Sequence, residues 1–217
     1  MNHPLRTFRC AWFGLLFVAW FNVACLGSER YWETFDSRGD STWASDGRTE
    51  VFGNIANGVY QFTVKEPNSF YWATAGQYFG DGTYEVEVRQ TGNVTDSGYG
   101  LMIRVNNNSH SFYRLGIDGF SNVTMDRCAQ DCEQYDTLVG VPWMFSPAVD
   151  VEAGAWNHLK IEIEDGELTF YVNEEKVGAA ADTDTLSSGD IGIFIDTGVE
   201  GNVTVWFDNA RFTPPEN

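Results

Sequence analysis

Polar and apolar side chains alternate along most of the chain after residue 28. Residues 84–90 (YEVEVRQ) place three apolar side chains on one face of a strand and charged side chains on the other. Residues 159–173 (LKIEIEDGELTFYVN) repeat this alternation on both sides of Asp165 and Gly166. Two alternating runs joined by an Asp-Gly pair are typical of a β-hairpin. The pattern therefore predicts a hairpin with its turn at these two residues.

Short alternating segments of the same kind recur along the chain and are separated by Gly, Asn and Asp turns. The other predicted strands cover residues 59–64, 69–75, 99–105, 111–117, 121–127, 190–196 and 202–212. Short strands at this spacing, without helical periodicity, indicate an all-β sandwich or barrel in one domain, residues 28–217. Segments 99–105 and 190–196 are apolar on both faces, which predicts central strands whose second face is also covered.

Residues 128–154 interrupt this rhythm. The segment contains two cysteines, two prolines and the large apolar residues Trp143, Met144 and Phe145. Loops this long in a compact domain are usually either functional or disordered. Because so many large apolar side chains argue against disorder, we predict a long structured loop.

The first 27 residues differ in composition and resemble an export signal. Two arginines precede an eleven-residue apolar run at 11–21, and small residues follow. This layout is typical of a cleaved signal peptide, and the run is shorter than the roughly 20 residues that a membrane span needs. The residues before Cys25 also resemble a bacterial lipobox, although Asn22 stands where Leu is usual. Acylation of Cys25 and an ordinary cut after Gly27 both stay open.

The rest of the chain is strongly acidic. Without Arg6 and Arg9 it carries 11 basic and 31 acidic side chains, a formal charge near −20. Phosphate groups would be repelled, which argues against nucleic acid and anionic membranes as partners. We expect a monomeric exported protein, either secreted or a cell-surface lipoprotein of a bacterial envelope. Its contact with the membrane would be limited to the signal or the lipid.

Only two cysteines, Cys128 and Cys132, follow the signal-like segment. In an exported protein such a close pair is expected to form a disulfide. A metal-binding pair is the alternative, but a Cys-x3-Cys spacing without a further cysteine or a nearby histidine is a poor metal signature. A local disulfide is therefore predicted.

Residues 155–177 (AWNHLKIEIEDGELTFYVNEEKV) resemble the concanavalin A-like lectin/glucanase superfamily, in particular its laminin-G-like and related bacterial jelly-roll modules. The shared pattern is a Trp before a strand, a tight turn and a strand that ends in YVN. Further segments resemble neighbouring strands of such modules, namely 33–37, 98–105, 111–117, 189–196 and 203–212. The resemblance implies a two-sheet antiparallel jelly-roll sandwich with one concave sheet, on or near which glycan is often bound.

The resemblance also implies a structural calcium ion. Many modules of the superfamily hold one between the first strand, a Gly turn and an Asp of the last strand, and Ca²⁺ takes about 6–8 oxygen ligands. Asp36, the turn at Asn57 and Gly58, and Asp208 stand in matching places. The alternative is that Asp36 and Asp208 cap strand ends or accept hydrogen bonds from turns.

No catalytic residue is predicted. Retaining glycosidases place two carboxylates about 5–5.5 Å apart, and those of the superfamily usually carry them in a motif such as E-I-D-I-E. The nearest segments, 85–87 and 162–167, are explained by the solvated face of an alternating strand. His110 and His158 have no catalytic motif around them. A hydrolase with carboxylates scattered along the chain stays an open alternative.

Aromatic residues make up 15% of the chain, more than one core requires. Rings beside amides, carboxylates and arginines form the usual sugar-binding sites. The predicted ligand-binding residues are Tyr71, Trp72, Arg104, Tyr113, Arg114 and Trp143. The alternative is that the rings fill the sandwich and that Arg104 pairs with a surface acid.

The sequence thus predicts a lectin-like module that binds carbohydrate or another extracellular ligand and has no catalysis of its own. Two alternatives stay open, a glycosidase or other glycan-processing enzyme of the same fold, and a structural or adhesion module with buried rings. Two neighbouring acids facing a groove, with raised or split pKa values, would favour the enzyme. A shallow, filled groove would favour the structural module.

Overall fold

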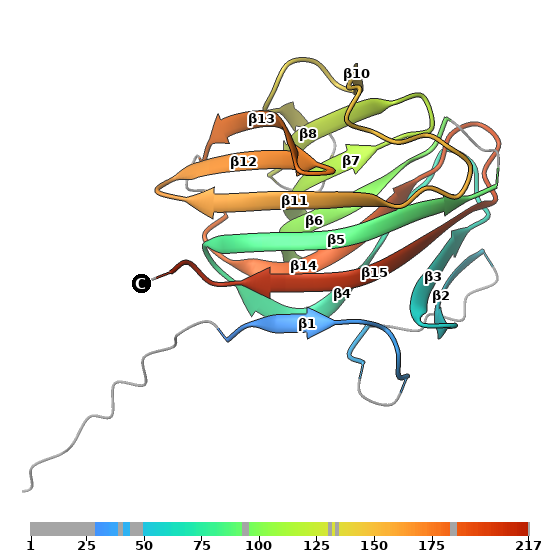
Figure 1. Cartoon of the computed structure of the whole chain (residues 1–217), viewed down its shortest axis with the longest axis horizontal. Coiled ribbons are helices and arrows are strands. Elements are labelled where there is room, and N and C mark those ends of the chain that lie inside the picture. Colours follow the sequence, from blue (N-terminus) through green and yellow to red (C-terminus); the bar gives the residue numbers. More distant parts are fainter. Residues whose placement is uncertain are drawn as a thin grey trace, which may run out of the picture.

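Two antiparallel β-sheets make up most of the described structure (Figure 1). The computed structural model describes residues 29–38, 41–43, 50–92, 96–129, 132, 135–182 and 186–216. The signal-like segment and Cys25 lie outside these residues, so export and acylation stay predictions. The described ranges contain no helix, and hence none with the length and apolar character of a membrane span.

The eight-stranded sheet contains the predicted hairpin. Its strands, in spatial order, are β13 (Glu175–Ala181), β12 (Glu167–Val172), β11 (Asn157–Glu164), β5 (Gly82–Thr91), β15 (Val203–Thr213), β3 (Val59–Val64) and β2 (Val51–Ala56), and β1 (Tyr31–Glu33) pairs with β15. Asp165 and Gly166 join β11 to β12 with φ angles of 50° and 77°. Because Gly and Asp tolerate positive φ, the pair forms a tight hairpin turn. This prediction is confirmed.

The seven-stranded sheet contains the two segments that are apolar on both faces. Its strands, in spatial order, are β10 (Met144–Phe145), β8 (Asn122–Cys128), β7 (Ser111–Ile117), β6 (Gly98–Asn106), β14 (Gly189–Asp196) and β4 (Phe70–Phe79), and β9 (Asp136–Thr137) pairs with β8. β6 and β14 are neighbours inside this sheet, as predicted. β9 and β10 lie within the predicted loop at 128–154 and are too short to show alternation in the sequence.

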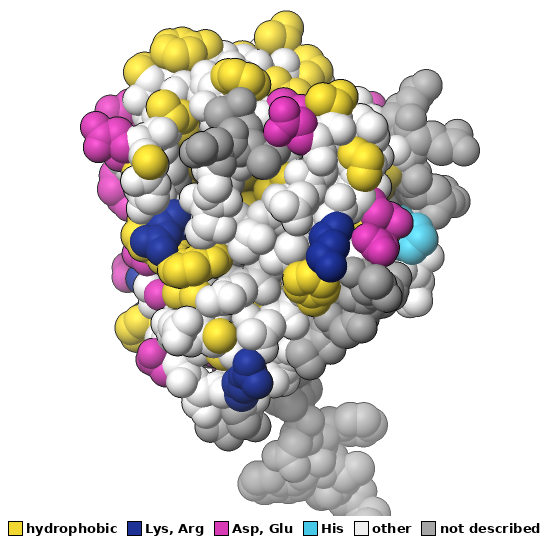
Figure 2. Space-filling view, turned by 90° about the vertical axis from the view of Figure 1, so that its right-hand side faces the viewer, with side chains coloured by type: hydrophobic (Ala, Val, Ile, Leu, Met, Phe, Trp, Pro, Cys, Tyr) yellow, Lys and Arg dark blue, Asp and Glu magenta, His cyan; other side chains and the backbone are white. Residues whose placement is uncertain are grey.

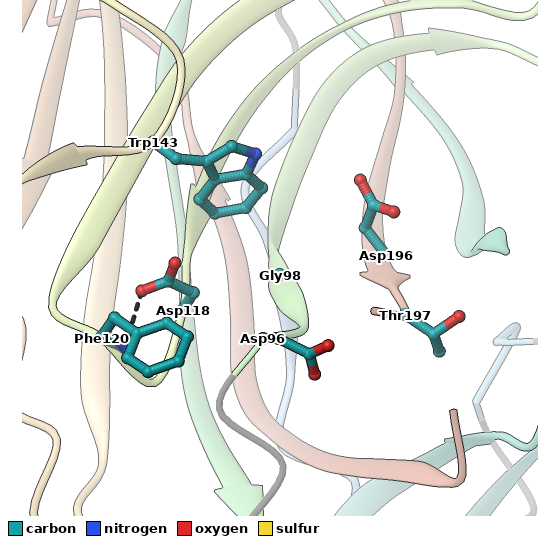
Figure 3. Close-up of a pocket in the computed structure, with 7 residues that line it drawn as sticks. All are labelled: Asp96, Gly98, Asp118, Phe120, Trp143, Asp196 and Thr197. Atoms are coloured by element: carbon teal, nitrogen blue, oxygen red, sulfur yellow. Dashed lines mark hydrogen bonds between the residues drawn. The ribbon is translucent and has the colours of Figure 1, made fainter. Parts of the chain in front are cut away.

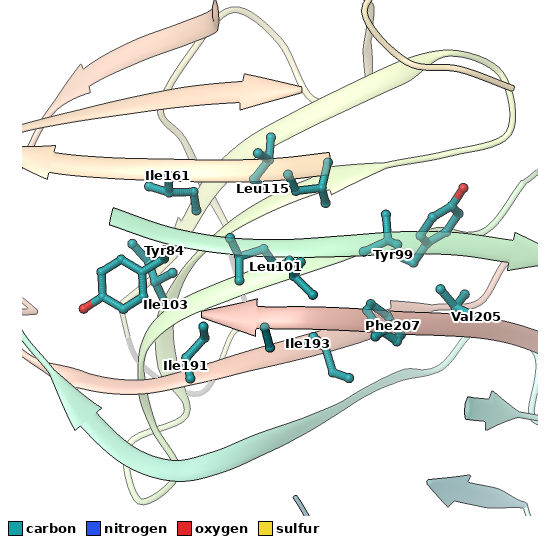
Figure 4. Close-up of a cluster of buried hydrophobic side chains, with 14 of the residues drawn as sticks. Tyr84, Tyr99, Leu101, Ile103, Leu115, Ile161, Ile191, Ile193, Val205 and Phe207 are labelled. Atoms are coloured by element: carbon teal, nitrogen blue, oxygen red, sulfur yellow. The ribbon is translucent and has the colours of Figure 1, made fainter. Parts of the chain in front are cut away.

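The core lies between the two sheets (Figure 4). Leu159, Ile161 and Ile163 enter it from β11, and Leu101 and Ile103 enter from β6 of the other sheet, all of them buried. Each such side chain stabilises the fold by roughly 1.5–3 kcal/mol through its removal from water. The architecture is the all-β jelly-roll sandwich that the sequence predicts.

The seven-stranded sheet is also covered on the face that points away from the core, called the outer face below. The apolar side chains there are Met102, Val105, Phe112, Cys128 and Phe194, with Phe70, Trp72, Cys132 and Tyr135 packed against them. Neighbouring residues of a strand point to opposite faces of the sheet. Each strand of this sheet therefore divides its side chains between the core and the outer face.

Cys128 and Cys132 form the predicted disulfide, with an S–S distance of 2.05 Å. Cys128 is the last residue of β8 and is fully buried. Cys132 packs against the outer-face cluster. The bond therefore ties the start of the long loop to the edge of the outer face.

Arg104 is turned away from the outer face by a β-bulge near the end of β6, where its own φ is 50°. Its Nη1 donates to Asp182 Oδ2 and its Nη2 to Asp81 Oδ1, each at 2.5 Å. The hydroxyl of Tyr113 donates to the same Asp182 carboxylate at 2.9 Å. Arg104 is only 2% exposed. Its buried side chain therefore links β6 to Asp182, which follows β13, and to Asp81, which precedes β5.

Arg104→Met tests this role. Removing one partner of a buried ion pair leaves the other charge without compensation, which costs about 3–5 kcal/mol. We expect the free energy of unfolding, measured by urea denaturation, to fall by that amount. Lys160→Met is the control, because Lys160 pairs with the partly exposed Glu162, and its effect should stay within about 1 kcal/mol. Equal effects of the two substitutions would contradict the account.

Candidate functional site

The centre of the outer face is Arg114 of β7, which lies directly opposite Asp126 of β8. Arg114 Nε donates to Asp126 Oδ1 at 2.6 Å, and Nη2 donates to Oδ2 at 3.1 Å. The hydroxyl of Thr124 donates to the same carboxylate at 2.8 Å. Two parallel charge-assisted hydrogen bonds fix the plane of a guanidinium. Arg114 is therefore held in one orientation.

The remaining nitrogen of Arg114, Nη1, faces Asp196 at the end of β14. The distance from Nη1 to Asp196 Oδ2 is 3.5 Å, longer than a good hydrogen bond. Among the described residues, Nη1 is buried and has no hydrogen-bond partner. Burial raises the pKa of Asp196 above its ordinary value, and the attraction of Arg114 offsets this only in part. A buried donor without a partner costs free energy, so an acceptor from a ligand would be stabilised here.

Three rings enclose the guanidinium of Arg114. Its Cζ lies 4.2 Å from the ring centre of Tyr135, 5.2 Å from that of Phe194 and 5.4 Å from that of Phe70. Aromatic rings attract a cation through their quadrupole, and the attraction grows when water is excluded. The rings therefore help to keep a positive charge on an otherwise apolar surface.

Trp143 rests against two glycines of the sheet. A Cβ added to Gly98 of β6 would lie 2.2 Å from Trp143 Cη2, and one added to Gly116 of β7 would lie 3.2 Å from the same atom. A side chain at Gly98 would displace the indole, and one at Gly116 would crowd it. The two glycines thus let a ring from the long loop lie directly on the outer face.

A cleft of about 260 Å³ opens between Trp143 and Asp196 (Figure 3). Its lining residues are Asp96, Gly98, Asp118, Phe120, Trp143, Asp196 and Thr197. Asp118 Oδ1 accepts the backbone N–H groups of Phe120 at 2.8 Å and Asn122 at 2.9 Å. Asp96 Oδ2 accepts the N–H of Val199 at 2.9 Å. The cleft therefore combines one large ring with carboxylates whose positions are fixed.

Hydrophobic side chains reach the surface near this cleft. Figure 2 views the end of the molecule where β6 and β15 begin and β14 ends, and it shows hydrophobic side chains gathered along the upper rim. Phe120, Val141, Phe145 and Val151 are all more than half exposed. Phe120 itself lines the cleft, so the opening has an apolar margin beside its acidic wall.

The six predicted ligand residues divide between the two faces of the sheet. Trp72, Arg114 and Trp143 lie on the outer face, whereas Tyr71, Arg104 and Tyr113 point away from it. Tyr71 and Tyr113 directly precede Trp72 and Arg114 in their strands, and the alternation of a strand sends such neighbours to opposite faces. The structure therefore places three of the six on one face, where Trp72 donates to Asn107 just after the end of β6 and Trp143 lies against Gly98 at its start. A ligand-binding role for any of the six stays a prediction.

Sequence reasoning missed the four aspartates around Arg114 and the cleft, which are Asp96, Asp118, Asp126 and Asp196. Asp196 ends one predicted strand, and Asp118 directly follows another. Asp126 occupies an outward position of β8. A signal was therefore present, namely acidic residues at the same end of neighbouring strands.

Sequence comparison supplies a family. The protein-family model described as a 3-keto-alpha-glucoside-1,2-lyase-like domain matches residues 30–213. The chain belongs to this family. No curated protein matches it in sequence.

Solved structures share the fold of this lyase-like domain at low identity. The carbohydrate binding module CBM66 from Bacillus subtilis is 20% identical, with a TM-score of 0.56 over 84% of this chain and 95% of that chain. A β-glucanase from Bacillus licheniformis is 11% identical, with a TM-score of 0.60 over 87% and 100%. The Crh5 transglycosylase in complex with NAG is 14% identical, with a TM-score of 0.61 over 86% and 84%. These likenesses confirm the jelly-roll fold.

The calcium residues expected in this lyase-like domain lie beside the eight-stranded sheet. A Cβ on Gly58 would lie 3.4 Å from Asp36 Oδ1, so the turn and this carboxylate are close. Burial raises the pKa of Asp208, and the charges of Glu87 and Asp36 add to the effect. In the described ranges, no group of three or more His, Cys, Asp or Glu side chains is arranged to hold a metal ion. A calcium ion here would need several backbone carbonyl ligands, and the site stays a prediction.

Thermal unfolding with calcium and with EDTA tests the calcium site. An ion that binds only the folded state raises Tm, by about 5–10 °C at roughly 100 times its Kd. We expect Asp208→Asn to remove this shift and Glu164→Gln, on the exposed hairpin, to retain it. Equal Tm values of the wild type under both conditions would mean that Asp36 and Asp208 act only as hydrogen-bond acceptors, as with Asp208 Oδ1 and the N–H of Asn209.

Proposed function

We propose that the outer face of the seven-stranded sheet binds carbohydrate in the cleft between Trp143 and Asp196. The observation that carries the proposal is the buried, unpartnered Nη1 of Arg114, which faces a residue of that cleft. Membership of the lyase-like family and the presence of a carbohydrate-binding module among the structural neighbours support the same ligand class.

The groups around the cleft complement a pyranose ring. A sugar presents apolar C–H faces and a rim of hydroxyls, which suits a pocket of apolar surface with a few placed polar groups. A C–H face would pack against Trp143, while hydroxyls would donate to Asp118 and Asp196. Arg114 Nη1 would donate to a sugar oxygen, because a guanidinium has donors only. Since Asp118 is held by backbone N–H groups and Arg114 by Asp126, these two groups would lose little ordering entropy on binding.

The same proposal includes export of the chain and a role in glycan binding without catalysis. Export rests on the signal-like residues 1–27 and on the acidic charge of the remainder. Cys25 would either carry a lipid or be removed with the signal. The protein would then meet its ligand outside the cell.

Isothermal titration calorimetry of two variants tests the site, with oligosaccharides chosen from a screen of soluble polysaccharides. We expect Trp143→Ala and Arg114→Lys each to weaken binding at least about 10-fold, or roughly 1.4 kcal/mol. Trp143→Ala removes the indole ring. Arg114→Lys replaces the planar guanidinium, which has several N–H donors, by an ammonium group that acts as a point charge.

Trp206→Ala is the matched control for this experiment. Trp206 lies between Val205 and Phe207, which point into the core, so its ring lies on the other side of the molecule. Its loss should leave the affinity unchanged. Unchanged affinity in Trp143→Ala, or a comparable loss in Trp206→Ala, would contradict the proposed site, and a folded wild type that binds no carbohydrate would overturn the function.

One observation favours a second function, elimination from a 3-keto-glucoside. Asp196 combines a raised pKa with a position 3.5 Å from Arg114, and the family is described by such chemistry. Asp196 would take the C2 proton, and the C2–H electron pair would form an enolate whose oxygen Arg114 stabilises. The enolate would then restore the C3 carbonyl, form a C1=C2 double bond and expel the C1 substituent. The departing oxygen would receive the proton from Asp196.

Asp196→Asn tests the elimination with an α-glucoside oxidised at C3. We expect the variant to form the unsaturated product at least about 100-fold more slowly, because proton transfer contributes about 10²–10⁴-fold to such reactions. Lowering the pH should reduce the wild-type rate, because Asp196 becomes protonated. Since the pKa of Asp196 is raised, this decrease should begin at a higher pH than for an ordinary aspartate. Glu164→Gln should react like the wild type. Absence of product from the wild type would assign the cleft to binding alone.

A further inference from the structure

The cleft carries negative charge that its surroundings do not balance. Asp96, Asp118 and Asp196 line it, and none of the described residues that line it is a Lys or Arg. In the described part of the chain, no basic side chain lies within salt-bridge distance of Asp96 or Asp118. Arg114 approaches Asp196, but it already forms its short bonds with Asp126. A ligand with a positive group would therefore be attracted, and an acidic ligand would be repelled.

Hydrogen bonds hold the carboxylates in place without using all of their acceptor capacity. From the described residues Asp96 accepts one N–H, that of Val199, whereas a carboxylate offers about four lone-pair sites. Asp118 accepts three donors, including Asn122 Nδ2 at 2.8 Å. Figure 3 shows the Asp96 carboxylate turned toward Thr197, the neighbour of Asp196. Among the residues that the structure describes, Asp96 and Asp196 therefore keep more free acceptor capacity than Asp118.

Arg114 supplies a second and independent requirement. Its side chain is 4% exposed, and its unpartnered Nη1 faces Asp196 at the cleft. A simple cation would satisfy the acids and leave this donor unpaired. A neutral sugar would satisfy the donor and leave the acids unbalanced. A ligand that places an ammonium group next to hydroxyl or ring oxygens would satisfy both.

We propose that the cleft selects an amino sugar, with the ammonium group of a hexosamine unit between Asp96 and Asp196. A ring or hydroxyl oxygen of the same unit accepts from Arg114 Nη1, and its C–H face packs against Trp143. This inference rests on the proposed carbohydrate-binding function, because it uses the same cleft. It goes further in naming the ligand class, a sugar with a free amino group instead of a neutral or acidic one.

Calorimetry with four matched tetrasaccharides tests the selection. The probes are a β-1,4-linked glucosamine tetramer, its fully N-acetylated counterpart, cellotetraose and a uronic acid tetramer. We expect the glucosamine tetramer to bind at least about 10-fold more tightly than the acetylated one, since acetylation removes the positive charge and keeps the ring. The uronic acid should bind most weakly. The preference should shrink at high salt, because charges near the surface are screened.

Asp96→Asn tests whether the ammonium group binds at Asp96. We expect this variant to bring the affinities for the glucosamine and acetylated tetramers to within about 3-fold of each other, because it removes a charge that the ammonium group pairs with. Glu164→Gln changes the net charge equally on the distant hairpin and should keep the full preference. An unchanged preference in Asp96→Asn would overturn the assigned position of the ammonium group.

The remaining outcomes separate this inference from the function on which it rests. Equal affinity of the wild type for the glucosamine and acetylated tetramers would overturn amino-sugar selection and leave carbohydrate binding intact. Absence of binding to all four probes and to every polysaccharide screened would overturn both. Loss of the preference on addition of calcium would show that the acids hold a metal ion, which also overturns the inference.

Discussion

Burial of a guanidinium costs several kilocalories per mole unless carboxylates and hydrogen bonds compensate it. Arg114 is buried in this way on the outside of the seven-stranded sheet, and the surrounding outer face is built around it. Asp126 meets it from the neighbouring strand with two parallel hydrogen bonds. Rings of Phe70, Tyr135 and Phe194 close around it from three separate segments. The arrangement explains why β6, β7 and β14 are buried on both faces.

The protein does not supply a hydrogen-bond partner for every nitrogen of Arg114. The nitrogen left without one, Nη1, faces a residue of the cleft. Among the described residues, the acceptor that Nη1 faces is Asp196 Oδ2, at 3.5 Å. Other polar groups of the molecule are better matched, as where Arg211 forms two short bonds to Glu85 on the opposite sheet. A structural salt bridge satisfies its members within the protein, whereas a binding site keeps some capacity for a ligand. Arg104 also has one buried nitrogen without a hydrogen-bond partner among the described residues, its Nε. Of the two arginines, Arg114 is the one whose unpartnered nitrogen faces a residue of the cleft, and this position favours Arg114 as the functional arginine and Arg104 as a structural one.

The features that the sequence predicted correctly depend on local patterns. The Asp165-Gly166 hairpin, the two central strands and the Cys128–Cys132 bond each follow from residues close together in the chain. One kind of error came from neglecting geometry. Adjacent residues of one strand, such as Tyr113 and Arg114, were assigned to one site although they must face opposite ways.

The remaining errors were not accessible from local patterns. Arg104 is redirected by a bulge in β6. This bulge arises where β6 pairs with both β7 and β14, and the register shifts against each of them. The aspartates of the outer face come from different strands and loops, and only the folded sheet brings them around Arg114. Their sequence signal, acids at the ends of neighbouring strands, requires the strand order of the sheet before it can be used.

The most direct test of the central claim is the NMR signal of the Arg114 Nε–Hε group during a saccharide titration. The signal can be assigned by its loss in Arg114→Lys, and the 2.6 Å bond from Nε to Asp126 Oδ1 should protect the proton from exchange with water. We predict that a carbohydrate shifts this signal and leaves that of Arg89, on the other sheet, unchanged. A saturating carbohydrate that moves the Arg89 signal, and not that of Arg114, would contradict the account.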